Sequence, residues 1–492
     1  MEHPARPRLE WLDSAKACGM FLIFYGHFVE RVYDLGNQAA LAQQKLIYAF
    51  HVPLFIVLAG FLARTAPELP ALGAFLKRQA ASRLLPVLFF SVLLMPLFAL
   101  FDQGGWEPER LKAQYVDDWP DLGRRLSPPA EGEQSPARRR LWEGLPAPAQ
   151  ALLARCAAGD SLDETGRNAV VEALNEELAR PGLFTAADLA GIKVAAEDQE
   201  RLAAGMPGAS PDEVRRFQIG LYFRVCFPEW FEDEDSPLGD WGRKALMTLK
   251  GYTEFNVPVW FLICLFTLEF YHYLMVRFLP TPGRIALAMP LFFAAGWWLT
   301  RDMEGWGKDI WFVRESVFLY AFYLGGYWLR RTEVLSRGVG RWSGWLLFLG
   351  ATAVLWFTFD LNPGSRIFKP VVLVNLSQHG DLVYFTVTAV FGCLAAIGLA
   401  RLLPSWSVIQ YVGRHSLVLM GLNGIFFDFL NVPMVHALGL PPTPWIILLG
   451  CTAVTLLSLA GCLPVVWLLD RYLPQLVGRP RAQGPLLPKL VP

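Results

Sequence analysis

Three ionisable residues share one face of the first long apolar stretch, which runs from Leu12 to Tyr33. At about 100° per residue, the eleven steps from Lys16 to His27 bring these side chains to within about 20° of each other around a helix axis. Asp13 falls roughly 40° to the other side, and His27 would lie ~16 Å further along the axis than Lys16. Ionisable groups inside a membrane usually face a cavity or a bundle interior and indicate a functional site.

The residue type best suited to acid–base chemistry on this face is His27. Imidazole gains and loses a proton near neutral pH, so a positioned histidine can serve as a general base. A histidine packed in a bundle and bonded to a neighbour is the alternative. The lysine and aspartate on the same face favour the functional interpretation.

A second histidine, His51, begins the second apolar stretch within the segment Phe50-His51-Val52-Pro53. Two antiparallel neighbouring helices would place it at a depth similar to that of His27, with ring centres about 8–10 Å apart. Pro53 would bend or open the helix just inside the membrane, which is common beside cavities. His51 could orient a substrate or simply bond a backbone carbonyl, and both interpretations stay open.

A basic cluster, Lys77, Arg78 and Arg83, lies at the start of the third apolar stretch. The positive-inside rule and contact with lipid headgroups explain basic residues at such a place. The alternative is a clamp for the phosphates of a cytosolic, nucleotide-bearing donor.

The composition indicates the elements that must position these residues. Of the 492 residues, 54% are hydrophobic, 14% aromatic and only 18% charged, and the mean hydropathy is +0.33. These values are too apolar for a soluble protein. Long apolar stretches precede residue 102 and follow residue 253, with a polar block between them. The sequence therefore predicts an all-α polytopic membrane protein.

Ten stretches are predicted to cross the membrane as helices. They are Leu12–Tyr33, Leu46–Ala63, Leu84–Phe101, Val257–Phe278, Ile285–Thr300, Ile310–Leu329, Trp342–Phe359, Leu382–Leu402, Ser416–Val435 and Trp445–Leu469. Basic residues are concentrated in the short loops on the side of the N-terminus, so the positive-inside rule places both termini in the cytoplasm. We expect a multi-pass protein of the cell (inner) membrane.

The predicted organisation has three parts. Residues 1–102 hold the first three helices with the candidate face, residues 103–250 form an extracytoplasmic insert that is mostly helical, and residues 251–492 hold helices 4–10 and a cytoplasmic tail. Between residues 103 and 245 there are 26 Asp and Glu against 17 Lys and Arg. An acidic insert on a basic membrane part is not typical of a nucleic-acid-binding protein, and we expect no nucleic-acid partner.

The seven cysteines are scattered and contain no CxxC pair, so we expect neither a metal site nor redox chemistry. Cys156 and Cys226 both lie in the polar block and could form a disulfide if the block is exported. Spacing alone does not decide this.

The order of these motifs resembles the type 3 acyltransferases, multi-span membrane enzymes that acylate glycans and other exported molecules. The family opens with Leu-Asp, a basic residue and, after ten intervening residues, a histidine, and this chain has Leu12-Asp13, Lys16 and His27. The family usually has arginine where Lys16 stands, which keeps the charge and loses the bidentate geometry. The segment 50–55, Phe-His-Val-Pro-Leu-Phe, is similar to the second span of the family.

Further similarities lie in both membrane halves. Residues 83–86, Arg-Leu-Leu-Pro, resemble the entry to the third span, and residues 259–262, Val-Trp-Phe-Leu, resemble the fourth. Residues 413–417, Gly-Arg-His-Ser-Leu, resemble the opening of the ninth span, but a histidine often found downstream is Asn423 here. The insert has no counterpart in this resemblance.

The resemblance implies acyl transfer from a cytosolic acyl-CoA, such as acetyl-CoA or succinyl-CoA, to a hydroxyl of a glycan or a lipid-linked saccharide at the outer side of the membrane lipids. His27 would be the base, and Lys16 and Asp13 would steady the donor or the charged pore. His51 is the remaining candidate catalytic residue. Lys77, Arg78 and Arg83 would hold the CoA phosphates.

Two other function classes stay open. A transporter or flippase would use the buried His, Asp and Lys side chains as a proton relay, although the sequence contains no clear internal repeat. A sensor would have the exported insert as its working part. The sequence does not indicate the oligomeric state.

Overall fold

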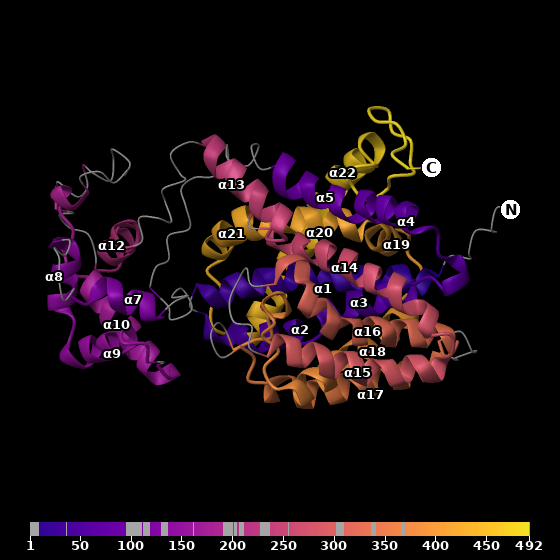
Figure 1. Ribbon diagram of the computed structural model, residues 1–492, viewed down its shortest axis with the longest axis horizontal. Helices are drawn as coiled ribbons and strands as arrows, with labels where there is room; N and C mark the ends of the chain where they lie inside the picture. Colours follow the sequence, from indigo (N-terminus) through magenta and orange to yellow (C-terminus); the bar gives the residue numbers. More distant parts are fainter. Residues whose placement is uncertain are drawn as a thin grey trace. The chain divides into compact units, whose positions relative to one another are not determined.

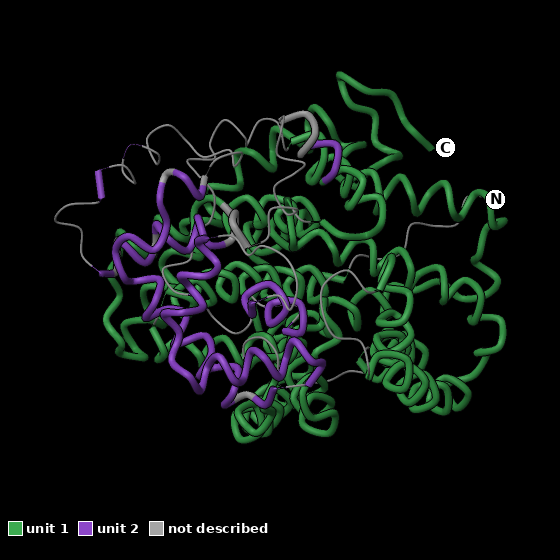
Figure 2. Tube along the Cα trace, turned by 60° about the vertical axis from the view of Figure 1, so that its left-hand side comes forward, with its two compact units in different colours: residues 1–101, 244–365, 370–492 green, residues 102–243, 366–369 purple. Residues whose placement is uncertain are grey.

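The computed structural model describes residues 9–35, 37–94, 111, 119–128, 136–160, 162–189, 200, 204–205, 211–226, 237–253, 255–301, 309–335, 341–365 and 370–491. The chain divides into two compact units, coloured in Figure 2. Unit 1 comprises residues 1–101, 244–365 and 370–492, and unit 2 comprises residues 102–243 and 366–369.

The described secondary structure is helical, apart from one isolated antiparallel bridge between Leu373 and Gln378. The helices of unit 1 are labelled in Figure 1. They are α1 (Glu10–Asp34), α2 (Leu41–Tyr48), α3 (His51–Phe61), α4 (Leu72–Gln79), α5 (Leu85–Leu88), α14 (Trp260–Met275), α15 (Pro282–Thr300), α16 (Val313–Arg331), α17 (Arg341–Thr358), α18 (Leu382–Leu402), α19 (Ser407–Arg414), α20 (Ser416–Ile425), α21 (Asn431–Leu438) and α22 (Pro444–Tyr472).

Five helical segments among the described residues are long and apolar enough to cross a membrane. They are Gln38–Phe61, Val257–Phe278, Trp342–Leu361, Leu382–Leu402 and Pro444–Tyr472. This confirms an all-helical protein with several candidate membrane spans, whereas the count of ten stays a prediction. Helix α1 covers the first predicted span, and the third predicted span is described only as far as Leu94.

Three π-helical turns interrupt the helices of unit 1: η3 (Ala80–Leu84), η4 (Phe89–Leu93) and η14 (Phe426–Leu430). The third predicted span therefore begins with η3, α5 and η4, and the ninth consists of α20, η14 and α21. Such turns redirect the side chains that follow them and occur frequently at functional sites.

Helix α1 is the centre of unit 1 and packs against α19, α18, α22, α2, α3 and α20. Small residues allow the close approaches. A Cβ added to Gly413 of α19 would overlap the backbone oxygen of Asp13, and a Cβ on Gly19 would lie 2.6 Å from the ring of Phe55. Helices without bulky side chains at their crossing can bring their backbones together, as is common in membrane bundles.

Helices α3 and α16 cross in the same way. A Cβ on Gly326 of α16 would overlap the backbone oxygen of Val57, and a Cβ on Gly60 of α3 would overlap that of Tyr323. The obstacle at each position is backbone, which cannot rotate away as a side chain can. Both glycines therefore fix the distance between α3, which carries His51, and α16.

The helices of unit 2 are α7 (Trp119–Leu126), α8 (Pro136–Gly144), α9 (Ala147–Ala157), α10 (Glu164–Leu178) and α12 (Pro211–Cys226). The boundary to unit 1 falls inside α13 (Pro237–Lys250). Unit 2 has an apolar core of its own, and buried Asn175 bonds both backbone groups of Leu111, at 2.7 and 2.9 Å. Cys156 is a buried free thiol, while the side chain of Cys226 lies outside the described residues.

One side chain in unit 2 combines burial with an ion pair. Burial raises the pKa of the Glu177 carboxyl, and the neighbouring Arg180 guanidinium, with which it forms an ion pair, opposes that rise. Burial therefore outweighs the ion pair.

We expect Gly326→Ala to lower the melting temperature of the purified protein in detergent, because α3 and α16 must separate to admit the methyl group. Overpacking a tight contact costs about 1–3 kcal/mol. Gly325→Ala is the matched control: its Cβ would meet only Met289 Sδ, at 3.9 Å. Equal melting temperatures for the two variants would contradict the close crossing.

Candidate functional site

The first candidate cavity, called the His27 cavity, has a volume of about 120 Å³ and lies among α1, α2, α3 and α14. His27 and Glu30 of α1 line it, together with Tyr48, His51 and Trp260. The structure therefore brings the two predicted histidines to one cavity. Ring centroids lie 6.4 Å apart for His27 and Tyr48, and 4.9 Å apart for Tyr48 and His51.

The tautomer of His27 is set by an amide from the other end of the chain. Nδ1 of His27 lies 2.5 Å from Oδ1 of Asn423 on α20. An amide oxygen only accepts hydrogen bonds, so Nδ1 carries the proton and Nε2 keeps a lone pair. The His27 ring also packs 4.9 Å from the ring of Phe427, over which the Arg31 guanidinium lies at 3.8 Å. A half-buried imidazole held in this way can accept a proton at Nε2.

The other polar residues of the cavity are bonded among themselves. Tyr48 donates its hydroxyl proton to Oε2 of buried Glu30, at 2.5 Å. Nδ1 of His51 donates to the carbonyl of Ile47, at 3.0 Å. Nε2 is the second nitrogen of the His51 ring and can bond another partner. His51 thus bonds a backbone carbonyl and also lines the cavity.

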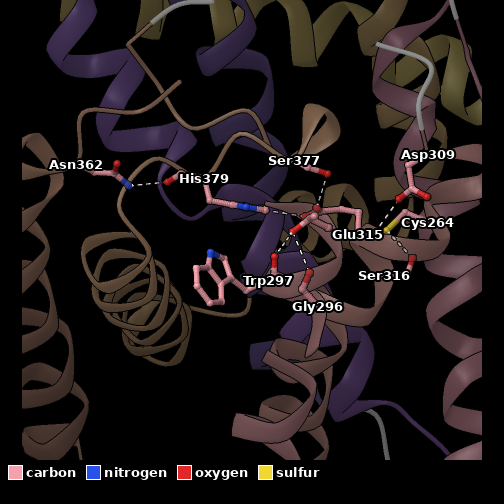
Figure 3. A network of polar contacts seen from close by, with 10 residues as sticks. Cys264, Gly296, Trp297, Asp309, Glu315, Ser316, Asn362, Ser377 and His379 are labelled. Atoms are coloured by element: carbon pink, nitrogen blue, oxygen red, sulfur yellow. Dashed lines mark hydrogen bonds and ion pairs between the residues drawn. The ribbon is translucent and has the colours of Figure 1, made fainter. Parts of the chain in front are cut away.

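One wall of the His27 cavity is the turn of residues 372–375, and a buried carboxylate holds it (Figure 3). Glu315, which is fully buried in the first turn of α16, accepts a bond from the Ser377 hydroxyl at 2.7 Å. Its other oxygen lies 2.9 Å from Nε2 of His379. Both partners stand directly after the wall, so Glu315 fixes the position of the wall relative to α16.

Asp309 caps the N-terminus of α16 and is labelled in Figure 3. Its two carboxylate oxygens accept the backbone N–H groups of Arg314, at 3.0 Å, and Glu315, at 2.8 Å. Burial raises the pKa of Asp309, and these two donors oppose the rise. The cap satisfies N–H groups that would otherwise be unpaired and fixes the turn that carries Glu315.

The second candidate cavity, called the cationic cavity, has a volume of about 490 Å³. Among the described residues that line it, six are lysine or arginine and one, Glu269, is acidic. The six basic residues are Lys16, Arg64, Arg78, Arg83, Arg479 and Arg481. Its size suits a small-molecule ligand, whereas the His27 cavity can take only the end of one.

Of the three residues predicted to clamp the phosphates, two line the cationic cavity. These are Arg78 and Arg83, whereas Lys77 is exposed and does not line it. Arg83 forms a two-pronged ion pair with Glu269 of α14, through Nη2 at 2.7 Å and Nε at 3.3 Å. One side of its guanidinium is thus engaged within the protein.

The ionisable residues predicted to share one face of α1 do not share one cavity. Lys16 lines the cationic cavity and His27 lines the His27 cavity, so the two residues lie at two sites along one helix. Asp13 is buried and lines neither cavity, and its backbone lies against Gly413 of α19.

The two cavities share three lining residues, Phe55, Phe261 and Met420, which we call the partition. The rings of Phe55 and Phe261 meet edge to face with centroids 6.1 Å apart. Gly19 of α1 leaves the space that the Phe55 ring occupies. These three apolar side chains therefore border both cavities.

Sequence reasoning missed several residues of the site. Glu30 could have been found, because it lies three residues after His27 on the same helical face. Asn423 was noticed only as a departure from the resemblance, and its contact with His27 spans 396 positions. Arg479 and Arg481 gave no local signal beyond their charge.

The comparisons with known proteins bear on the first part of the chain. Residues 9–116 match a family model described as an acyltransferase domain. The match supports the resemblance of this part of the chain to the type 3 acyltransferases. No curated protein and no solved structure matches the chain. The type 3 acyltransferase match covers α1 to η4, and with them His27, His51 and Lys16. Together with the apolar helices, it indicates a membrane acyltransferase.

We expect Glu315→Ala to destabilise the protein by about 3–5 kcal/mol, because His379 and Ser377 lose a fully buried partner. The measurement is the midpoint of thermal unfolding in detergent. Asp360→Ala is the control, since it removes a carboxylate from an exposed pair with Lys45, which is worth about 0–1 kcal/mol. A Glu315→Ala midpoint equal to that of the control would show that Glu315 does not hold the wall.

Proposed function

We propose that this protein is a membrane O-acyltransferase that moves an acetyl or succinyl group from cytosolic acyl-CoA to a hydroxyl of a glycan or lipid-linked saccharide at the outer side. The observation that carries the proposal is the pair of cavities along α1. One is rich in cations, the other contains a histidine whose Nδ1 is held by Asn423, and three apolar residues line both.

The cationic cavity would bind the donor. The excess of positive charge suits the phosphates of CoA, because charge-assisted bonds to phosphate are among the strongest in proteins. Arg78 and Lys16 would contact the donor inside the cavity and Lys77 at its mouth. Arg83 would add Nη1, the atom that Glu269 leaves unengaged. The acyl end would extend through the partition toward His27.

The His27 cavity would carry out the transfer. Nε2 of His27 would take the proton of the acceptor hydroxyl as its oxygen attacks the thioester carbonyl. The carbon–sulfur bond then breaks, an ester forms, and the proton on His27 passes to the CoA thiolate. Asn423 would keep His27 in the required tautomer, and His51 would orient the acceptor. Asp13, which lines neither cavity, would act by positioning α1 against α19.

The proposed topology has ten spans, both termini in the cytoplasm and residues 103–250 outside the cell (inner) membrane. The distribution of charge supports this orientation. The basic residues that line the cationic cavity all lie near helix ends or loops that the positive-inside rule assigns to the cytoplasm, as Arg64, Arg78 and Arg479 illustrate. The His27 cavity would then lie toward the outer side, where the acceptor arrives.

A transporter or flippase is the second candidate. The observation that favours it is the alignment of ionisable residues with two cavities along one helix, which would also suit a proton relay. The two candidates differ in what they need. An acyltransferase consumes acyl-CoA in detergent, whereas a transporter requires a sealed vesicle.

We expect His27→Ala to reduce acyl transfer from labelled acyl-CoA by about 10²–10⁴-fold, because loss of a general base typically has this effect. The assay uses purified full-length protein in detergent, and the product is detected by mass spectrometry. His436→Ala is the control, since His436 is exposed on α21 and lines neither cavity. Transfer by His27→Ala at the wild-type rate, or no turnover of acyl-CoA by the wild type, would reject the proposal.

We expect Phe55→Ala to widen the partition, and so to increase the rate with succinyl-CoA relative to acetyl-CoA and to increase acyl-CoA hydrolysis by admitted water. The measurement is the ratio of kcat/KM for the two donors together with the release of free CoA. Phe357→Ala, on the exposed face of α17, is the control. An unchanged donor ratio and unchanged hydrolysis would mean that the acyl group does not pass Phe55.

A further inference from the structure

The chain that follows α22, residues 473–491, forms an ordered segment without a long helix, which we call the strap. In Figure 1 it is the yellow trace that turns back on itself before the C-terminus. Gln475 is fully buried and donates to the carbonyls of Ala482, at 2.9 Å, and Leu487, at 2.6 Å. The backbone N–H of Leu490 donates to the carbonyl of Pro480, at 2.9 Å. These bonds give the strap a fixed shape.

Arg479 fastens the strap to the helices. Its Nη1 lies 2.6 Å from Asp470 on α22, and its Nη2 lies 3.1 Å from Nε2 of His415. His415 is buried between α19 and α20 and donates from Nδ1 to the carbonyl of Tyr411, at 2.8 Å, so Nε2 can accept from Arg479. The charge of Arg479 is thus balanced within the protein, and its role is to hold the strap.

Gly478 directs the strap into the cationic cavity. Its φ of +90° lies in the left-handed region that favours glycine, and a Cβ there would lie 2.8 Å from the side chain of Leu417. Residues 478–482 line the cavity as a result. The strap is therefore one wall of the site that we propose for the donor.

Arg481 has a different environment from Arg479. Both arginines are exposed and line the same cavity, but Arg481 forms no ion pair with any residue that the structure describes. Arg78 of α4 lines the cavity from another element, and the one acidic lining residue, Glu269, is already paired with Arg83. A partly enclosed cavity with this excess of guanidinium groups attracts a multiply charged anion.

We propose that the strap forms part of an anion site, in which Arg481 of the strap and Arg78 of α4 bind a phosphate ester of the donor. The inference rests on the proposed function, because it assigns this phosphate to CoA. A phosphate on a lipid headgroup shares the same chemistry and could reach the same arginines. Planar guanidinium groups bind phosphate oxygens in pairs, which a lysine does less well.

The test measures CoA binding to the purified full-length protein in detergent by isothermal titration calorimetry. We expect Arg481→Gln to raise the Kd for CoA at least tenfold, because a charge-assisted bond is lost. Arg481→Lys should restore part of the affinity. Arg471→Gln is the matched control, since Arg471 stands near the end of α22, lies 5.7 Å from the Trp467 ring and does not line the cavity. Arg481 is exposed, so the fold should be unaffected, and equal melting temperatures will verify this.

The outcomes separate this inference from the proposed function. Wild-type protein that binds CoA, with Arg481→Gln binding equally well, would overturn the role of the strap and leave the acyltransferase proposal standing. Absence of CoA binding by the wild type would overturn both. A second titration uses nanodiscs of phosphatidylglycerol: an Arg481→Gln effect on phosphatidylglycerol binding alone would assign the arginine to lipid and overturn the donor assignment.

Discussion

The structure of unit 1 depends on one constraint: a polar group among apolar helices must find its partner inside the protein. Without water, an unsatisfied group costs several kcal/mol, and an unpaired charge costs more. His27 is bonded to Asn423, Arg83 to Glu269 and Glu30 to Tyr48. Each partner comes from a different helix. The need to satisfy these groups therefore links the helices in a specific arrangement, in addition to the packing of apolar side chains.

The positions of glycines and of π-helical turns are related to where the helices pack closely and where the cavities lie. Where a glycine faces the neighbouring helix, as Gly60 of α3 and Gly326 of α16 each do, the helices touch along their backbones. The cavities lie beside π-helical turns instead, since Arg83 of η3 lines the cationic cavity and Phe427 of η14 lines the His27 cavity. The π-helical turn η14 follows α20 directly. Asn423 therefore contacts His27 from an α-helical turn, and Phe427 contacts it from the π-helical turn that follows. The site is thus located where regular helix packing is interrupted.

The sequence predicted the helices better than the site. The bounds of α18, Leu382–Leu402, agree with its predicted span because hydrophobicity over about 20 residues is a strong local signal. The π-helical turn Phe426–Leu430 was not predictable, because it arises from tertiary packing. Helical periodicity placed Lys16 and His27 on one face, and both line cavities. Periodicity could not find Asn423, since residues 396 positions apart share no local pattern.

The partition of Phe55, Phe261 and Met420 has a consequence for the energy supply of the cell. In the proposed orientation, one cavity communicates with the cytoplasm and the other with the outer side. An enzyme that passed whole molecules across would have to open a path for protons and small ions as well. Under the proposed function, only an acyl group, uncharged or carrying one carboxylate, would cross these three apolar side chains. Such a protein would modify molecules on the outer side without discharging the ion gradient that the membrane maintains.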